Sequence, residues 1–178
     1  AHIRGARHYV VYNYGLVPAL DTQGINIVPH GGRYVGRRRW VKLYFEREVR
    51  PLLIPVGLDP SHPFPQVANK SLNFIVRLSG RDAFGRENEI AIVKVPRVLP
   101  RMIRMPERVC GQTNFFVSLS SVIRAHLAEL FPGRDAGRFS QFSVPRTYNP
   151  RVDEGKLKNL QTALARVLRT RTFGRRAR

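Results

Sequence analysis

A run of cations interleaved with aromatic rings, residues 37–47, constrains the fold of this chain more than any other stretch. Its odd positions Val41, Leu43 and Phe45 are apolar. Because side chains of a β-strand point alternately to opposite faces, this pattern predicts a strand with one face on a core. The opposite face presents Arg38, Trp40, Lys42 and Tyr44. Cations neutralise phosphates and flat rings stack on bases, so this face suits nucleic acid; the alternative is an amphipathic edge strand whose rings lie on a neighbouring element.

The charge of the chain indicates a polyanionic partner. Its formal net charge is +19, and 26 of its 31 cations are arginine, which favours bidentate phosphate contacts. Nucleic acid is the first candidate and an anionic membrane surface the second. No apolar run approaches the ~20 residues needed to span a bilayer. The cations are also spread along the chain, unlike those of a membrane-surface helix, so we expect no membrane partner.

Strands precede helices in the predicted order of elements. The β-prone or extended segments are residues 8–14, 25–28, 49–56 (an edge strand or connection, because of Pro51 and Pro55), 71–79, 89–95 (a central strand), 97–105 and 115–119. One helix begins after a cap at Ser120 or Ser121 and ends at Pro132. A second, amphipathic helix covers residues 153–169. The result is one α+β nucleic-acid-binding domain over residues 1–168 and a flexible basic tail over 169–178.

Catalytic chemistry has little support in the sequence. The five histidines are scattered without metal-ligand spacing, and the single cysteine, Cys110, excludes an intrachain disulfide. Asp82, Glu87 and Glu89 could gather around a divalent ion or could belong to a polar hairpin loop. No P-loop or dinucleotide fingerprint is present. We therefore expect no catalytic residue, no metal site, no cofactor and no small-molecule substrate, that is, a protein that is not an enzyme.

A second basic segment could track a phosphate backbone. Arg97, Arg101, Arg104 and Arg108 recur through an extended stretch, although they could equally form a solvated edge that discourages aggregation. Neither basic segment implies base-edge readout, so binding should be largely independent of sequence and sensitive to salt. The candidate binding residues are Arg38, Arg39, Trp40, Lys42, Tyr44, Arg97, Arg101, Arg104 and Arg108.

Three segments carry a resemblance to a known family. They are residues 36–46, ending Trp-Val-Lys-Leu-Tyr-Phe-Glu, residues 101–119, and Val144-Pro145 with the helix after it. They resemble a strand along the nucleic-acid face, the last strand pair and the strand-to-helix passage of the Whirly-type fold, in particular the mitochondrial guide-RNA-binding proteins of kinetoplastids. The resemblance implies two four-stranded antiparallel sheets packed roughly perpendicular, with a C-terminal amphipathic helix buried in a tetramer.

The resemblance also implies a function. It implies a protein of the mitochondrial matrix that binds guide RNA through its phosphates and promotes annealing to messenger RNA in RNA editing. Its partners would be single-stranded or stem-loop RNA and, in a homo- or hetero-tetramer, a related subunit. The alternatives are a lineage-specific mitochondrial ribosomal protein embedded in ribosomal RNA and a viral nucleoprotein. A nuclease comes last, for want of a metal-binding cluster.

Overall fold

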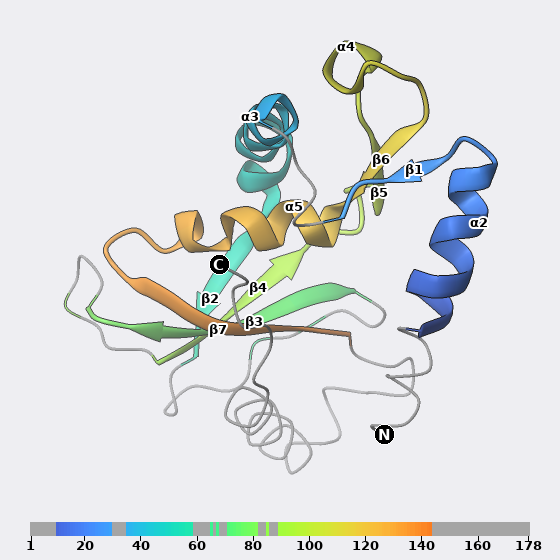
Figure 1. The fold of residues 1–178 in the computed structure, drawn as a ribbon. Helices are drawn as coiled ribbons and strands as arrows, with labels where there is room; N and C mark the ends of the chain where they lie inside the picture. Colours follow the sequence, from blue (N-terminus) through green and yellow to red (C-terminus); the bar gives the residue numbers. More distant parts are fainter. Residues whose placement is uncertain are drawn as a thin grey trace. The chain divides into compact units, whose positions relative to one another are not determined.

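The basic and aromatic stretch is helical in the computed structural model of this chain (Figure 1). The structure describes residues 10–29, 35–58, 65, 67, 71–81, 85 and 89–143. Helix α3 spans Val35–Tyr44 and continues as a π-helical turn, η2, over Phe45–Val49. The strand predicted for residues 37–47 is therefore wrong.

Side-chain burial explains why this stretch is a helix. Val41, Phe45 and Val49 recur at every fourth position, which places them on one face of a helix, and all three are fully buried. A strand would put Leu43 on the core face between Val41 and Phe45, yet Leu43 is 42% exposed. The helical spacing gains Val49 as a third core residue and leaves Leu43 outside, among the cations.

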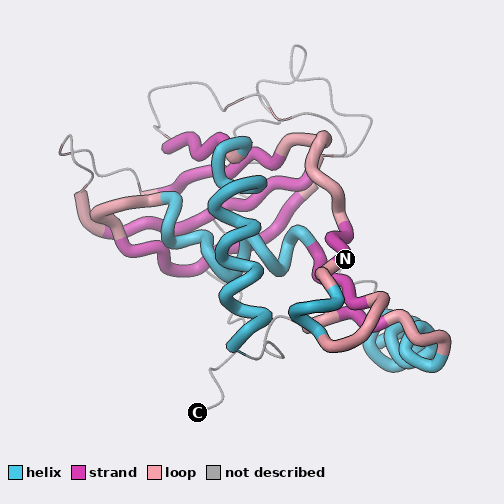
Figure 2. The backbone as a smooth tube through the Cα atoms, turned by 90° about the horizontal axis from the view of Figure 1, so that it is seen from above, coloured by secondary structure: helices cyan, strands magenta, loops and turns pink. Residues whose placement is uncertain are grey.

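The chain divides into two compact units. The first comprises Ala1–Val49 and Leu99–His126, and the second comprises Arg50–Val98 and Leu127–Arg178. Each unit contains one sheet, and the strands are distinguished from the helices in Figure 2. Helix α3 belongs to the first unit.

The first unit contains a three-stranded sheet with the order β1-β6-β5. Its strands are β1 (Asn26–Ile27), β5 (Met102–Arg104) and β6 (Phe115–Ser118), and the four-residue helix α4 (Glu107–Cys110) lies between β5 and β6 in the chain. β1 runs parallel to β6, whereas β5 is antiparallel to it, with Ile103 opposite Val117. Ile103 and Val117 are buried, but Met102 and Arg104 are exposed. One face of this sheet therefore packs on the core and the other carries Arg104. The strand predicted over 115–119 is confirmed.

The β-prone run predicted over residues 8–14 is helical where the structure describes it. A π-helical turn, η1, spans Val11–Leu16 and leads into α2, Val17–Thr22. Pro18 has no N–H and its ring crowds the carbonyl four residues earlier, so the wider π-helical turn precedes it. The strand preference of valine and tyrosine does not prevent the helix, because such preferences are weak and depend on context.

The second unit contains a four-stranded antiparallel sheet with the order β2-β4-β3-β7. Its strands are β2 (Ile54–Gly57), β3 (Leu72–Ser79), β4 (Ile90–Val95) and β7 (Asp135–Phe142). β4 pairs with both β2 and β3, and Ala91, Ile92 and Val93 are buried. The central strand predicted over 89–95 is therefore confirmed. Pro55 lies on the edge strand β2, as its missing N–H requires.

Two features of the second sheet were not expected. β7 was not predicted, because its sequence is mostly polar; it is held by pairing with β3 around a bulge between Val76 and Leu78. Asn73 was expected on an outer face but is buried. Its amide nitrogen donates hydrogen bonds to the carbonyl oxygen and the hydroxyl of Ser71, at 3.1 and 2.8 Å, so the buried polar group is satisfied.

The helix predicted from residue 120 is confirmed as α5, Leu119–His126, which continues as a 3-10 turn, η4, over Leu127–Leu130. Its cap is Ser118, not Ser120 or Ser121, because the Ser118 hydroxyl accepts the Ser121 N–H at 3.2 Å. The helical region ends before Gly133, whose φ of +76° suits a residue without a Cβ.

The fold class is confirmed as α+β with two mostly antiparallel sheets. The described sheets have three and four strands, in contrast to the four and four of the Whirly-type expectation. The amphipathic helix predicted over 153–169 and the tail over 169–178 lie outside the described residues. Within the described part of the chain, no helix is long and apolar enough to cross a membrane.

Candidate anion-binding surface

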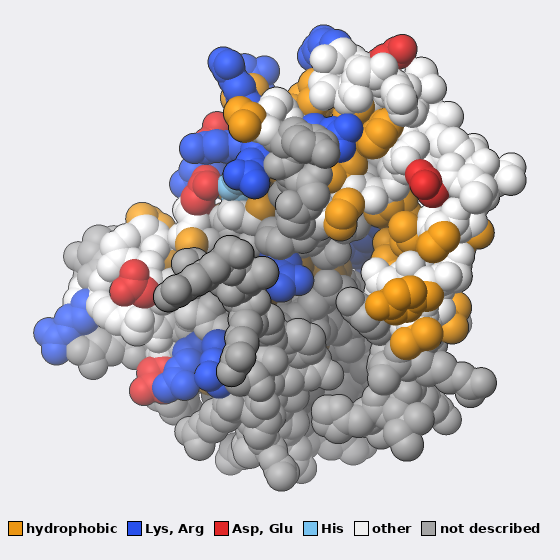
Figure 3. Space-filling view, viewed as in Figure 1, with side chains coloured by type: hydrophobic (Ala, Val, Ile, Leu, Met, Phe, Trp, Pro, Cys, Tyr) orange, Lys and Arg blue, Asp and Glu red, His pale blue; other side chains and the backbone are white. Residues whose placement is uncertain are grey.

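Cations cover the solvent side of α3. Arg38 and Lys42 lie one helical turn apart and Arg39 lies beside them; all three side chains are exposed. We call these three residues the α3 cation surface, and Figure 3 shows Lys and Arg side chains gathered over this helix. Lys42 Nζ lies 3.9 Å from Glu46 Oε1. An exposed pair of this kind is worth only about 0.3–0.5 kcal/mol, so Lys42 can exchange Glu46 for a phosphate at little cost.

Trp40 and Tyr44 form a stacked pair beside the α3 cation surface. Their ring centroids lie 5.2 Å apart with an interplanar angle of 25°. Both residues are half-buried. Burial, and secondly the negative charge of Glu48, raises the pKa of the Tyr44 phenol above its usual value. The pair is therefore an uncharged border to the cations.

Arg37 joins α3 to the sheet of the same unit. Its guanidinium carbon lies 4.7 Å from the centroid of the Phe115 ring, at the start of β6. A cation over an aromatic face at this distance contributes about 0.5–1 kcal/mol at an exposed site. The contact fixes α3 beside β6, and with it the position of the α3 cation surface in the unit.

Arg104 is held by the turn that precedes β6. Its Nη2 donates a hydrogen bond to Asn114 Oδ1 at 3.3 Å. Asn114 has a φ of +62°, in the left-handed region that asparagine tolerates better than most residues. Its carbonyl oxygen accepts the N–H of Asn26 at 3.0 Å. Asn114 therefore links β1 to the side chain of Arg104.

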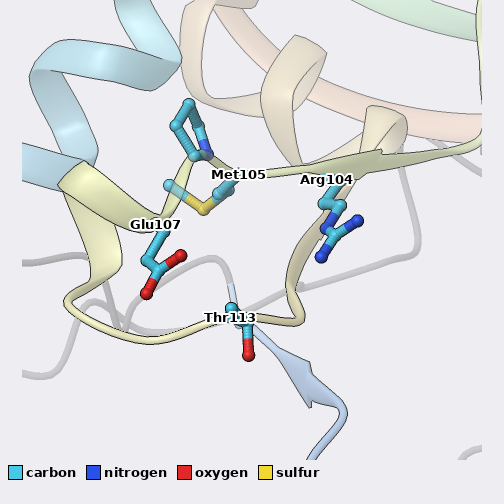
Figure 4. A pocket seen from close by; sticks show the side chains of 5 residues that line it. Arg104, Met105, Glu107 and Thr113 are labelled. Carbon is cyan, nitrogen blue, oxygen red and sulfur yellow. The ribbon is translucent and has the colours of Figure 1, made fainter.

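Arg104 also lines an open pocket of about 230 Å³ (Figure 4). The other lining residues are Met105, Pro106, Glu107 and Thr113. In Figure 4 the charged ends of Arg104 and Glu107 both extend toward the turn that carries Thr113. The Glu107 carboxylate repels a phosphate inside the pocket, so the three exposed cations of α3 form the better anion site.

The structure places the predicted binding residues in both units. Arg97 lies in the second unit. The first unit holds Arg38, Arg39, Trp40, Lys42 and Tyr44 on α3, Arg101 and Arg104 at β5, and Arg108 on α4. Sequence reasoning missed the roles of Arg37 and Asn114. Arg37 belongs to the arginine run that prompted the prediction, but nothing in the sequence signals the hydrogen bond of Asn114 to Arg104.

Residues capable of catalysis or metal binding were also located. The ring of His126 stacks on Phe45, with centroids 4.9 Å apart. Cys110 is a half-buried free thiol. In the portion of the chain that the structure describes, no group of three or more His, Cys, Asp or Glu residues could hold a metal ion.

Related sequences match nearly the whole chain. The family model described as "Polyphosphate kinase middle domain" matches residues 36–178. The polyphosphate kinase of Neisseria meningitidis serogroup B is 44% identical over 169 residues, 94% of this chain and 25% of that protein. That of Pseudomonas aeruginosa is 42% identical over 173 residues, 97% of this chain and 25% of that protein. The chain thus spans about a quarter of the length of the curated relatives it matches.

A solved structure shows the same fold. The crystal structure of polyphosphate kinase from Porphyromonas gingivalis matches 79% of this chain and 22% of that chain, with a TM-score of 0.66 and 24% sequence identity. The fold is therefore that of the corresponding part of a polyphosphate kinase and not the Whirly-type fold.

These matches contradict the resemblance to guide-RNA-binding proteins and the function drawn from it. Binding of guide RNA, annealing and RNA editing are wrong predictions, and neither a ribosomal protein nor a viral nucleoprotein is supported. The physical reason for the error is that residues 36–46, which carried the resemblance, are a helix. Their cations attract any polyanion, so the charge did not reveal which polyanion is bound.

Three further expectations are corrected by the same matches. The relatives are named as kinases, so the expectation of a protein that is not an enzyme is wrong. RNA and a related tetramer subunit were expected as partners, whereas the relatives are named for polyphosphate. The relatives come from bacteria, which contradicts a location in the mitochondrial matrix.

Proposed function

This chain belongs to the family of polyphosphate kinase middle domains, and from this premise we propose that it supplies a polyphosphate-binding surface within a polyphosphate kinase. The single observation that carries the proposal is the α3 cation surface. Its three exposed cations lie on a helix whose opposite face is fixed in the core by Val41, Phe45 and Val49. Arg101, Arg104 and Arg108 extend the surface over β5 and α4 in the same unit. Binding by Arg97, in the second unit, stays a prediction.

Polyphosphate presents the same chemical group as the sugar–phosphate backbone of RNA, but without bases. Each of its units carries negatively charged non-bridging oxygens, which guanidinium groups bind through two parallel hydrogen bonds. Stacking surfaces are not needed for such a polymer. The mutual stacking of Trp40 and Tyr44, which turns each ring toward the other, is compatible with this ligand.

The role of such a surface in a kinase is to hold and orient the polymer. Phosphoryl transfer depends mainly on positioning and on electrostatic stabilisation of the charge on the transferred group. A cationic helix anchored in a core provides both without being displaced by the charge it binds. Because this chain spans only a quarter of its relatives, we propose that the transfer itself uses the full-length polypeptide.

The experiment that tests the proposal is equilibrium binding of polyphosphate to the 178-residue chain and two charge-matched variants. The double variant Arg38→Ala/Lys42→Ala removes two cations from α3. The control Arg50→Ala/Arg81→Ala removes two exposed cations from the second unit and leaves the same net charge. We expect the α3 variant to bind about ten- to a hundred-fold more weakly, since each lost charge-assisted hydrogen bond is worth roughly 1.5–3 kcal/mol before compensation by other cations.

A general charge effect gives a different result. If the two variants weaken binding equally, polyphosphate responds to net charge alone and the α3 cation surface is not its site. Circular dichroism and thermal unfolding of both variants check that neither substitution disturbs the fold; none is expected to, because all four side chains are exposed.

A further inference from the structure

The N-terminal helical segment of the first unit, η1 with α2, is apolar on the side that faces solvent. Residues 10–20 contain no charged side chain, although 24% of the chain is charged. Val11 is 61% exposed and Tyr14 is 76% exposed. The other large exposed apolar side chains of the segment are Val10, Tyr12 and Leu16. Hydrophobic side chains gather over this helix in Figure 3. A contiguous patch of this kind marks an interaction surface, whereas scattered apolar residues need no explanation.

The inward side of the same segment is no more apolar than its outward side. Asn13, Val17 and Leu20 recur at spacings of four and three and are half-buried. The Leu20 carbonyl accepts the Ile25 N–H at 2.9 Å, where the chain turns back into β1. A surface helix normally turns its apolar stripe to the core and its polar face to water. The core of this unit therefore does not account for the outward valines and tyrosines.

The segment lies outside the middle domain but within the match to full-length relatives. The family model begins at residue 36, beyond the end of α2 at Thr22. The Pseudomonas aeruginosa match covers 173 of the 178 residues, so at most five, 178 minus 173, are unmatched. Most of η1 and α2 therefore has a counterpart in that kinase, at a place that precedes its middle domain.

We propose that the outward face of η1 and α2 is an interdomain surface, on which the part of the full-length kinase that precedes the middle domain packs. The surface made by Val10, Val11, Tyr12, Tyr14 and Leu16 calls for an apolar partner without charge, such as the apolar stripe of another helix. Its two tyrosines supply large contact areas with a polar tip that can stay at the rim. The inference rests on the proposed function, because it requires the chain to be part of a polyphosphate kinase.

Amide hydrogen exchange tests the packing directly. Exchange of the amides of residues 11–22 is compared between the 178-residue chain and the full-length kinase that contains it. We expect at least ten-fold slower exchange in the full-length protein, because a covered helix opens only when its partner leaves. Equal exchange rates in the two proteins overturn the proposal.

A pair of variants separates packing from general destabilisation. Val11→Glu/Tyr14→Glu places two charges on the outward face, and the control Val98→Glu places one charge on a residue of the second unit that is 76% exposed. The double variant should lower the melting temperature of the full-length kinase by several degrees and should remove the slow exchange. It should leave the melting temperature of the 178-residue chain unchanged, and the control should change neither protein.

The remaining outcomes also decide. If light scattering shows that the 178-residue chain dimerises and that Val11→Glu/Tyr14→Glu abolishes the dimer, the surface pairs with a second copy and the interdomain proposal is wrong. Polyphosphate binding of the 178-residue chain is measured on the same variants and should be unchanged, since the α3 cation surface is intact. A loss of slow exchange with normal polyphosphate binding therefore separates this inference from the proposed function.

Discussion

The guanidinium carbon of Arg37 lies 4.7 Å from the centre of the Phe115 ring. This contact joins α3, which carries the cation surface, to β6, the central strand of the three-stranded sheet. Arg37 is half-buried, in contrast to the exposed Arg38 and Arg39 that follow it. In one run of three arginines, therefore, the first serves the fold and the next two face solvent.

Removing either partner of this contact should cost a small, measurable amount of stability. We expect a double-mutant cycle of Arg37→Ala and Phe115→Leu to give a coupling energy of about 0.5–1 kcal/mol. Urea unfolding of the four proteins provides the measurement. Arg38→Ala combined with Phe115→Leu is the control and should show no coupling. Coupling as strong for Arg38 as for Arg37 would mean that the ring does not distinguish them.

Substitutions in the stretch of residues 37–47 distinguish a helix from a strand. Phe45→Ala should destabilise the chain by about 3–5 kcal/mol, because a large, fully buried ring is lost. Leu43→Ala should cost about 0.5 kcal/mol or less, because Leu43 lies on the outer side. Chemical denaturation measures both. A loss for Leu43→Ala as large as that for Phe45→Ala would be the result of a strand that buries both residues.

The sequence allowed some elements to be predicted and misled on others for identifiable reasons. β4 was predictable because it is apolar at both parities, as a strand covered on two faces must be. In residues 37–47 the period-2 and period-4 patterns share Val41 and Phe45, so the assignment depended on Leu43 alone, and its exposure was not visible in the sequence. β7 could not be recognised, because pairing with β3 and not its own polar sequence makes it a strand.

Asn114 should tolerate glycine better than alanine. Its φ of +62° costs a residue with a Cβ roughly 1–2 kcal/mol, which glycine avoids. Both substitutions remove the acceptor of the Arg104 hydrogen bond, so the difference between them isolates the backbone strain. We expect thermal unfolding to rank Asn114→Gly above Asn114→Ala. The reverse order would show that this turn does not hold the left-handed conformation in solution.

The phenol of Tyr44 should ionise above its usual pKa of 10.0. Burial and, secondly, Glu48 favour its neutral form, so the folded protein retains the proton to a higher pH than the unfolded chain does. The resulting stabilisation is complete below the unfolded pKa, and the free energy of unfolding falls as pH rises from there through the folded pKa. The ultraviolet difference titration between the protein and Tyr44→Phe measures this pKa. Glu48→Gln should lower it, because one of the two causes is removed.

The site was predictable as a charge but not as a partner. The exposed cations of α3 follow from the arginine run, whichever secondary structure carries it. Phosphates of RNA and of polyphosphate attract these side chains by the same hydrogen bonds, so residue type alone cannot separate the two ligands. The contribution of Asn114 depends on a turn that brings it to Arg104, and turns of this kind have no local sequence pattern that specifies a distant partner.

The most direct measurement of the central claim is a heteronuclear NMR titration of the 178-residue chain with polyphosphate, observing the arginine Nε–Hε and lysine Nζ groups. Signals of Arg38, Arg39 and Lys42 should shift progressively and saturate, and the shifts should diminish as salt is raised. The signal of Arg50, in the second unit, should stay in place. Saturating shifts confined to the second unit, or no shifts at any polyphosphate concentration, would contradict the account.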